Sequence, residues 1–168
     1  MELDDFDKII IDELRGKWHE IIKGKGGHCP CCDRWGKVNA FKLTQALALT
    51  LKWMQLHPDG SGWIDMQNKA PRWILRAKCY PVLAYWKLIE FENHCSGIWG
   101  ITQKGLDFLN GVITIPQKAF VYNNQVFDVS EKQVSFRDCF GKKFDYDEML
   151  SDRYDWNKVK TNDKKGVV

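Results

Sequence analysis

The chain has 168 residues, 44% of them hydrophobic and 28% charged, and it carries a net charge of +3. This hydrophobic fraction excludes an intrinsically disordered chain, and no apolar run approaches the roughly 20 residues that a membrane-spanning helix needs. The acidic N-terminus has neither an apolar segment nor a small-residue cleavage site, so we expect no secretory signal and a cytoplasmic protein. The six cysteines are then expected to be thiols.

Positive charge is concentrated in the middle of the chain. Residues 21–105 carry 12 Lys and Arg against 5 Asp and Glu, whereas residues 1–20 are acidic and residues 106–168 are balanced. A local excess of this kind attracts a polyanion. Lysines that only keep helices hydrated would give the same count, and the sequence leaves both interpretations open.

The N-terminal segment predicts two helices on either side of a cysteine-rich turn. Apolar residues at spacings of three and four predict an amphipathic helix over 3–22, and a helix with a broad apolar face is expected over 39–56. The first helix either packs on its own chain or pairs two copies in a homodimer. The sequence does not decide between these two arrangements.

The turn between these helices contains a two-cysteine metal motif. Cys29 and Cys32 have the C-x2-C spacing that places two thiolates on one tetrahedral ion, so we predict a zinc knuckle there. A complete site needs two further ligands. His94 and Cys95, adjacent in a later turn, are the predicted completing pair; alternatively, these two residues lie in that turn without binding metal. The other available donors are His28 and Cys31 within the knuckle, and Cys79 and Cys139 further along the chain. A redox role would need a parallel-sheet context that the surrounding pattern does not provide.

After a Pro- and Gly-containing linker over 57–62, the pattern predicts a helix, a hairpin and a second helix. Pro81 opens the first of these helices, where a proline costs no hydrogen bond. A hairpin centred on two asparagines is expected further along, with a short helix after it. The expected elements are a strand over 63–66, helices over 71–79 and 81–90, a strand over 98–102, a helix capped by Thr102 and closed by Gly111, and a hairpin over 119–129.

The order helix, hairpin, helix, with LIE before the hairpin and ITQKGLDFL after it, resembles winged helix-turn-helix proteins, many of which bind DNA in bacteria and phages. The resemblance covers residues 63–111 and implies that the helix over 81–90 is the recognition helix. The chain is also similar to uncharacterised small phage proteins that join a C-x-x-C knuckle, such a core, and a tail like VYNNQVF and FGKKFDYDEML.

We therefore expect an α+β, mainly helical fold with a winged helix-turn-helix core, a small zinc knuckle and a C-terminal β-hairpin. The core is the part that the resemblance covers, and the tail is polar in composition. The expected segments are 1–57 with the N-terminal helices and the knuckle, 63–111 with the core, 112–150 with the hairpin and a short helix, and 152–168 as a polar tail.

Basic residues in two clusters are candidates for contact with nucleic acid. The expected recognition helix has few side chains that pair with base edges, so we expect little sequence specificity, with duplex DNA favoured over single strands. The predicted contact residues are Lys69, Arg72, Arg76, Lys78 and Lys87, together with Arg34 and Lys37 beside the knuckle.

No catalytic motif occurs in the sequence, and we expect a protein that is not an enzyme. The resemblance implies a nucleic-acid-binding protein of a phage or mobile element that acts in the cytoplasm of a bacterial host cell. The alternative is a protein-binding inhibitor of a host nucleic-acid-handling machine, of which anti-CRISPR proteins are an example.

Overall fold

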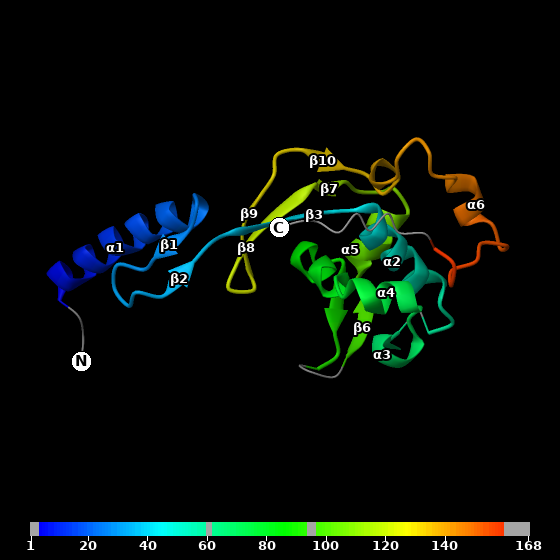
Figure 1. Cartoon of the computed structure of the whole chain (residues 1–168), viewed down its shortest axis with the longest axis horizontal. Helices are drawn as coiled ribbons and strands as arrows, with labels where there is room; N and C mark the ends of the chain where they lie inside the picture. The colour runs from blue at the N-terminus through cyan, green and yellow to red at the C-terminus, as the bar shows by residue number, and fades with distance from the viewer. Residues whose placement is uncertain (1–3, 60–61, 94–96, 160–168) are drawn as a thin grey trace. The chain divides into compact units, whose positions relative to one another are not determined.

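The computed structural model of the chain describes residues 4–59, 62–93 and 97–159 (Figure 1). The fold is α+β, with 42% of the described residues in helices and 21% in strands, and the described strands form four small sheets. The predicted mainly helical class with a winged helix-turn-helix core is therefore wrong, and no clear fold assignment replaces it. The prediction assigned Asn39–Lys42 to a helix, and it did the same for Ile89 and Glu90, whereas these residues lie in strands. No helix in the described part of the chain is long and apolar enough to cross a membrane.

The chain divides into two compact units. Unit 1 comprises Met1–Phe41 and Ala119–Val129, and unit 2 comprises Lys42–Lys118 and Ser130–Val168. The hairpin near the C-terminus is thus grouped with the N-terminal helix and the knuckle. The elements that lie wholly or mainly in unit 1 are α1 (Asp5–Lys23), β1 (Gly27–His28), β2 (Trp35–Gly36), β3 (Asn39–Lys42), β8 (Lys118–Tyr122) and β9 (Gln125–Val129).

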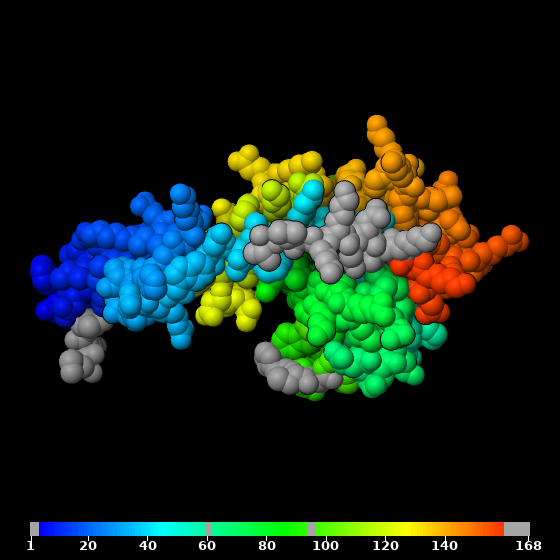
Figure 2. All heavy atoms as spheres, viewed as in Figure 1, coloured from blue at the N-terminus to red at the C-terminus, as the bar shows by residue number. Residues whose placement is uncertain are grey.

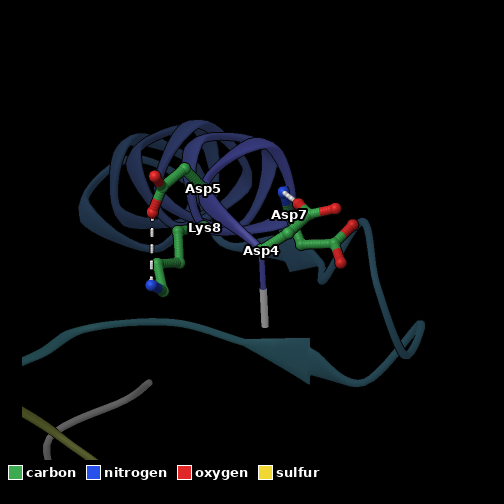
Figure 3. A network of polar contacts seen from close by, with 4 residues as sticks. All are labelled: Asp4, Asp5, Asp7 and Lys8. Carbon is green, nitrogen blue, oxygen red and sulfur yellow. Dashed lines mark hydrogen bonds and ion pairs between the residues drawn. The ribbon is translucent and has the colours of Figure 1, made fainter. Parts of the chain in front are cut away.

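Helix α1 begins with a cluster of acidic side chains. Asp4 is its N-cap, and the Asp4 Oδ1 atom accepts a hydrogen bond from the Asp7 backbone N–H at 2.8 Å. Lys8 pairs with Asp5 at 3.3 Å in the same turn (Figure 3). Carboxylates at a helix N-terminus cap backbone donors and interact favourably with the helix dipole. The helix predicted over 3–22 is confirmed for the residues that the structure describes.

The C-terminal half of α1 packs against other parts of unit 1. The Trp18 ring meets Tyr122 of β8 edge to face at 6.0 Å, and the His19 ring meets Phe127 of β9 at 5.2 Å between centroids. Gly36 in β2 is buried against the Trp18 ring. A Cβ atom at this position would lie 2.8 Å from that ring. The close approach of the indole to the knuckle therefore requires a glycine at this position.

The predicted hairpin over 119–129 is confirmed. It turns at Asn123 and Asn124, whose φ angles of 51° and 60° suit asparagine in a two-residue hairpin turn. Strand β3 lies on the other side of β8, so the sheet order is β3-β8-β9.

Unit 2 is built around helix α2. The helix predicted over 39–56 starts later than expected, because Thr44 is its N-cap and accepts a hydrogen bond from the Leu47 backbone N–H at 3.4 Å. Leu51 and Met54 of this helix are fully buried. The first elements of unit 2 are α2 (Gln45–Leu56), β4 (Ile64–Asp65), α3 (Met66–Lys69), α4 (Arg72–Ala77), the 3₁₀ helix η1 (Tyr80–Trp86), β5 (Ile89–Phe91), β6 (Ile98–Ile101) and α5 (Gln103–Leu109).

A three-stranded antiparallel sheet in the order β4-β6-β5 contacts α2 and α5 through its central strand. The strand predicted over 98–102 is confirmed as β6, and the predicted Thr102 cap accepts a hydrogen bond from the Gly105 backbone N–H at 3.1 Å. Gly105 allows α5 to approach the sheet. A Cβ atom there would collide with the Leu88 carbonyl oxygen and lie 2.7 Å from the Ile101 Cγ2 atom.

The predicted recognition helix over 81–90 is wrong in type and in length. The chain forms a 3₁₀ helix that ends at Trp86, and Lys87 then adopts a left-handed conformation with φ 58°. The apolar residues Leu88 and Ile89 leave the helix and are buried at the start of β5. The helical spacing of apolar residues in this segment therefore reflects two elements that face one core.

The C-terminal part of unit 2 closes its core with aromatic side chains. The Phe136 ring contacts Phe108 of α5 edge to face at 5.9 Å and Phe140 at 5.1 Å. The Trp73 indole of α4 donates a hydrogen bond to the Trp156 carbonyl oxygen at 2.7 Å. The elements here are β7 (Ile115–Pro116), β10 (Gln133–Val134), the 3₁₀ helix η2 (Arg137–Cys139) and α6 (Tyr146–Leu150).

Candidate metal half-site and nucleic-acid interface

Backbone hydrogen bonds fold residues 27–36 into a tight knuckle. Strands β1 and β2 pair antiparallel, and between them the Cys29 N–H donates to the Arg34 carbonyl oxygen at 2.9 Å. The Asp33 N–H donates back to the Cys29 carbonyl oxygen at 2.9 Å, and Asp33 takes a left-handed conformation with φ 58°. These bonds close the turn that the C-x2-C spacing predicts and bring its cysteines together at the tip.

The knuckle favours the thiolate form of Cys29. The backbone N–H groups of Cys31 and then Cys32 lower the pKa of Cys29, and the two neighbouring thiols act in the same direction. Cys29 is partly buried, whereas Cys31 and Cys32 are exposed. Donors directed at a sulfur atom stabilise the thiolate, which is the form that binds a metal ion. The Cys29 and Cys32 pair thus has the chemistry of two ligands of a tetrahedral site.

His28 has one ring nitrogen committed to the turn. Its Nδ1 atom lies 2.7 Å from the Asp33 carbonyl oxygen, and because a carbonyl only accepts, Nδ1 carries the hydrogen. The Nε2 atom then keeps its lone pair, and the side chain is 62% exposed. This tautomer is the one that metal-binding histidines use.

Among the described residues, no group of three or more His, Cys, Asp or Glu side chains could hold a metal ion. The predicted ligands His94 and Cys95 lie outside the described residues. In unit 2, burial raises the pKa of the Cys139 thiol to about 12, so this cysteine is disfavoured as a thiolate.

Four of the predicted nucleic-acid contacts follow one another in unit 2. Lys69 ends α3, Arg72 and Arg76 lie four residues apart on the same side of α4, and Lys78 follows α4 with φ 48°. All four side chains are exposed, as is that of Lys87. None of the five takes part in an ion pair within the described residues.

Lys87 belongs to a surface groove of about 540 Å³ beside strand β5. The Thr102 hydroxyl donates a hydrogen bond to the Lys87 carbonyl oxygen at 2.6 Å, which holds the two ends of the hairpin together. This bond places Lys87 and Lys104 on the same groove. The lining is mostly apolar, and it consists of Ala84, Lys87, Ile89, Glu90, Phe91, Thr102, Gln103 and Lys104.

The sequence prediction missed Lys104 and Gln103 as candidate contacts. The antiparallel register that pairs Ile89 with Ile101 brings the residues just outside the hairpin close together, and the sequence prediction lacked this register because it placed Ile89 in a helix. Lys87 precedes β5 and Lys104 follows β6, so both residues lie at the same end of this antiparallel pair.

The second predicted basic cluster belongs to unit 1. Arg34 and Lys37 are exposed on and beside the knuckle. The Trp35 side chain of β2 is 56% exposed. Basic and aromatic side chains therefore lie next to the cysteines, on the surface of the knuckle.

No protein-family model matches the chain, and neither curated proteins nor solved structures give a match.

Proposed function

We propose that the chain is a non-enzymatic nucleic-acid-binding protein of a phage or mobile element, acting in the cytoplasm of a bacterial host. The observation that supports this is the set of five exposed cations in unit 2 that form no ion pair within the described residues. Cations with no carboxylate within ion-pair distance are available to neutralise phosphates and release counterions. The proposed source rests on the sequence resemblance, and the proposed location rests on the expected absence of a secretory signal.

The proposed contact uses the phosphate backbone rather than base edges. Arg72 and Arg76 present two guanidinium groups from one side of α4, and guanidinium groups suit bidentate contact with phosphate. Lys87 and Lys104 flank a groove that also includes the exposed Phe91 ring. We expect binding to depend on charge and groove shape, with weak preference for sequence.

The test is binding of a short fluorescent DNA duplex to the full chain, measured by anisotropy at several salt concentrations. Five phosphate contacts predict a loss of affinity of about 500-fold between about 50 and about 200 mM salt. The double variant Arg72→Gln and Arg76→Gln should lower the slope of log affinity against log salt by about 2. Its matched control is Lys142→Gln with Lys143→Gln, which removes the same charge from another exposed segment of unit 2.

The proposal fails if the wild-type chain does not bind the duplex, or if binding does not change with salt. It also fails if the control pair lowers the slope as much as the arginine pair, because net charge alone would then explain the binding. A single strand of the same sequence, measured in parallel, decides whether duplex DNA is the preferred ligand.

The apolar lining of the groove favours a second candidate function. Ala84, Ile89 and Phe91 could accept an apolar side chain from a protein partner, as expected for an inhibitor of a host nucleic-acid-handling machine such as an anti-CRISPR protein. This function predicts that a tagged chain retains one host complex from lysate at high salt. Phe91→Ser should abolish that capture, whereas Arg72→Gln with Arg76→Gln should not.

A further inference from the structure

The knuckle of unit 1 presents two metal ligands at an exposed turn. Cys32 is exposed and Cys29 is partly buried. The Cys29 N–H bonds to the Arg34 carbonyl oxygen and the Cys29 carbonyl oxygen accepts from the Asp33 N–H, each at 2.9 Å, between the paired strands β1 and β2. Backbone hydrogen bonds thus close the turn that carries both ligands.

A structural zinc ion takes four ligands, so a C-x2-C turn supplies half of a site. Two such turns, related by a twofold axis, supply a complete set of four sulfur atoms, since a symmetric dimer presents the same surface from both copies. Exposure of the turn makes this approach sterically open. Each knuckle needs no other residue of its own chain to complete the site.

Unit 1 has a second feature that suits another copy of the chain. Helix α1 exposes Phe6 to 69% and Ile9 to 65%, and Ile10 beside them is 40% exposed. Figure 2 shows atoms of this part of α1, in dark blue, open on the face in view. Apolar side chains gathered on one helix turn gain free energy when a partner covers them. The metal half-site and the open apolar turn thus occur in the same unit.

We propose that Cys29 and Cys32 of two copies of the chain bind one zinc ion between them, in a tetrahedral site of four thiolates. Four thiols lose their protons to solvent when zinc binds, which leaves the site with a charge of −2. The exposed Arg34 and Lys37 of each copy supply compensating positive charge beside the sulfur atoms. The proposal is independent of the proposed nucleic-acid binding.

The test uses the full chain purified without added metal. Elemental analysis should find one zinc ion for every two chains, and light scattering during gel filtration should give the mass of a dimer. A chelator should convert the dimer to monomers, and added zinc should restore it. In cobalt-substituted protein, the intensity of the thiolate-to-cobalt absorption should correspond to four thiolates for each ion.

Three variants decide which ligands hold the ion. Cys29→Ser with Cys32→Ser should be a monomer that holds no zinc. Cys31→Ser is the matched control, because it removes a thiol from the same turn but leaves the C-x2-C pair intact, and it should remain a zinc dimer. His94→Ala with Cys95→Ser should also remain a dimer with half an equivalent of zinc. Circular dichroism establishes that each variant keeps its helices.

One zinc ion in each monomer overturns the proposal, and its loss in the His94 and Cys95 variant would identify a site within one chain. A dimer that survives metal removal also overturns it, as does purified chain that holds no zinc at all. Since none of these outcomes depends on DNA, failure of this proposal and failure of nucleic-acid binding are separately visible.

Discussion

Units 1 and 2 differ in how many side chains they remove from water. Of the 25 buried hydrophobic residues in the described part of the chain, 22 belong to unit 2, and Ile22, Ala119 and Val121 belong to unit 1. Complete burial of a large apolar side chain contributes about 1.5 to 3 kcal/mol. Unit 2 therefore has a hydrophobic core that can stabilise its fold. Unit 1 depends more on ring contacts such as the edge-to-face pair of Trp18 and Tyr122.

The difference indicates where additional binding energy would matter most. A small unit with few buried apolar side chains is marginal without a metal ion or a partner. A ligand that binds the folded form stabilises it by mass action, and a structural zinc ion does so strongly. The proposed zinc dimer would therefore supply unit 1 with the stability that unit 2 obtains from its core.

The largest expected effect comes from opening a cavity in unit 2. Phe108 is fully buried and packs edge to face on Phe136. Phe108→Ala should lower the free energy of unfolding by about 3 to 5 kcal/mol, measured by urea denaturation with tryptophan fluorescence. In metal-free, monomeric protein, Phe6→Ala in α1 should change it by less than about 0.5 kcal/mol, because Phe6 is 69% exposed in the single chain. Equal losses in the two variants would contradict the assignment of the core to unit 2.

The rate at which cysteines are alkylated should also differ between the two units. Burial raises the pKa of Cys139 from 9.0 to about 12, which lowers its thiolate fraction near neutral pH by about a thousandfold. Donors in the knuckle lower the pKa of Cys29. In metal-free protein, iodoacetamide should therefore modify Cys29 long before Cys139, as followed by mass spectrometry of peptides. Comparable rates would show that unit 2 opens readily at Cys139.

Several local features could be predicted from the sequence because short-range chemistry determines them. The paired asparagines at 123 and 124 turn a hairpin, and Thr102 caps a helix, as their residue types indicate. The C-x2-C spacing likewise predicted the tight turn of the knuckle. In each case the interactions span only a few residues.

Features that depend on distant contacts could not be predicted in this way. The apolar spacing over 81–90 fits one helix, yet burial of Leu88 and Ile89 in a sheet ends the helix at Trp86. The groove beside Lys87 requires the register of β5 and β6. In both cases, contacts between residues that are distant in the sequence override the structure that the local pattern predicts.

Removing a helix cap should have a smaller effect on stability, and the effect should again differ between the two units. In unit 2, the Thr102 hydroxyl accepts from the Gly105 N–H and donates to the Lys87 carbonyl oxygen at 2.6 Å. Thr102→Ala should therefore cost about 1 to 2 kcal/mol of global stability. Asp4→Ala removes one cap from an exposed helix end and should cost less than about 0.5 kcal/mol in the same urea experiment, because the first turn of α1 can fray alone. A larger loss for Asp4→Ala would mean that α1 unfolds together with unit 2.

The smallest expected effect concerns acid. A hydrogen bond from the Asn68 side chain lowers the pKa of Asp65 in unit 2, and the Lys17 side chain lowers the pKa of Glu13 in unit 1. A carboxyl whose pKa is lower in the folded state contributes stability above its unfolded pKa of about 4 and loses that contribution as pH falls through the folded value. Asp65→Asn keeps an oxygen acceptor for the cap but no charge, so the stability of unit 2 should fall less steeply below about pH 4. Glu13→Gln should leave the acid limb of the urea denaturation profile unchanged, since its ion pair with Lys17 at 2.9 Å lies on α1. An equal change in both variants would mean that the two units unfold as one.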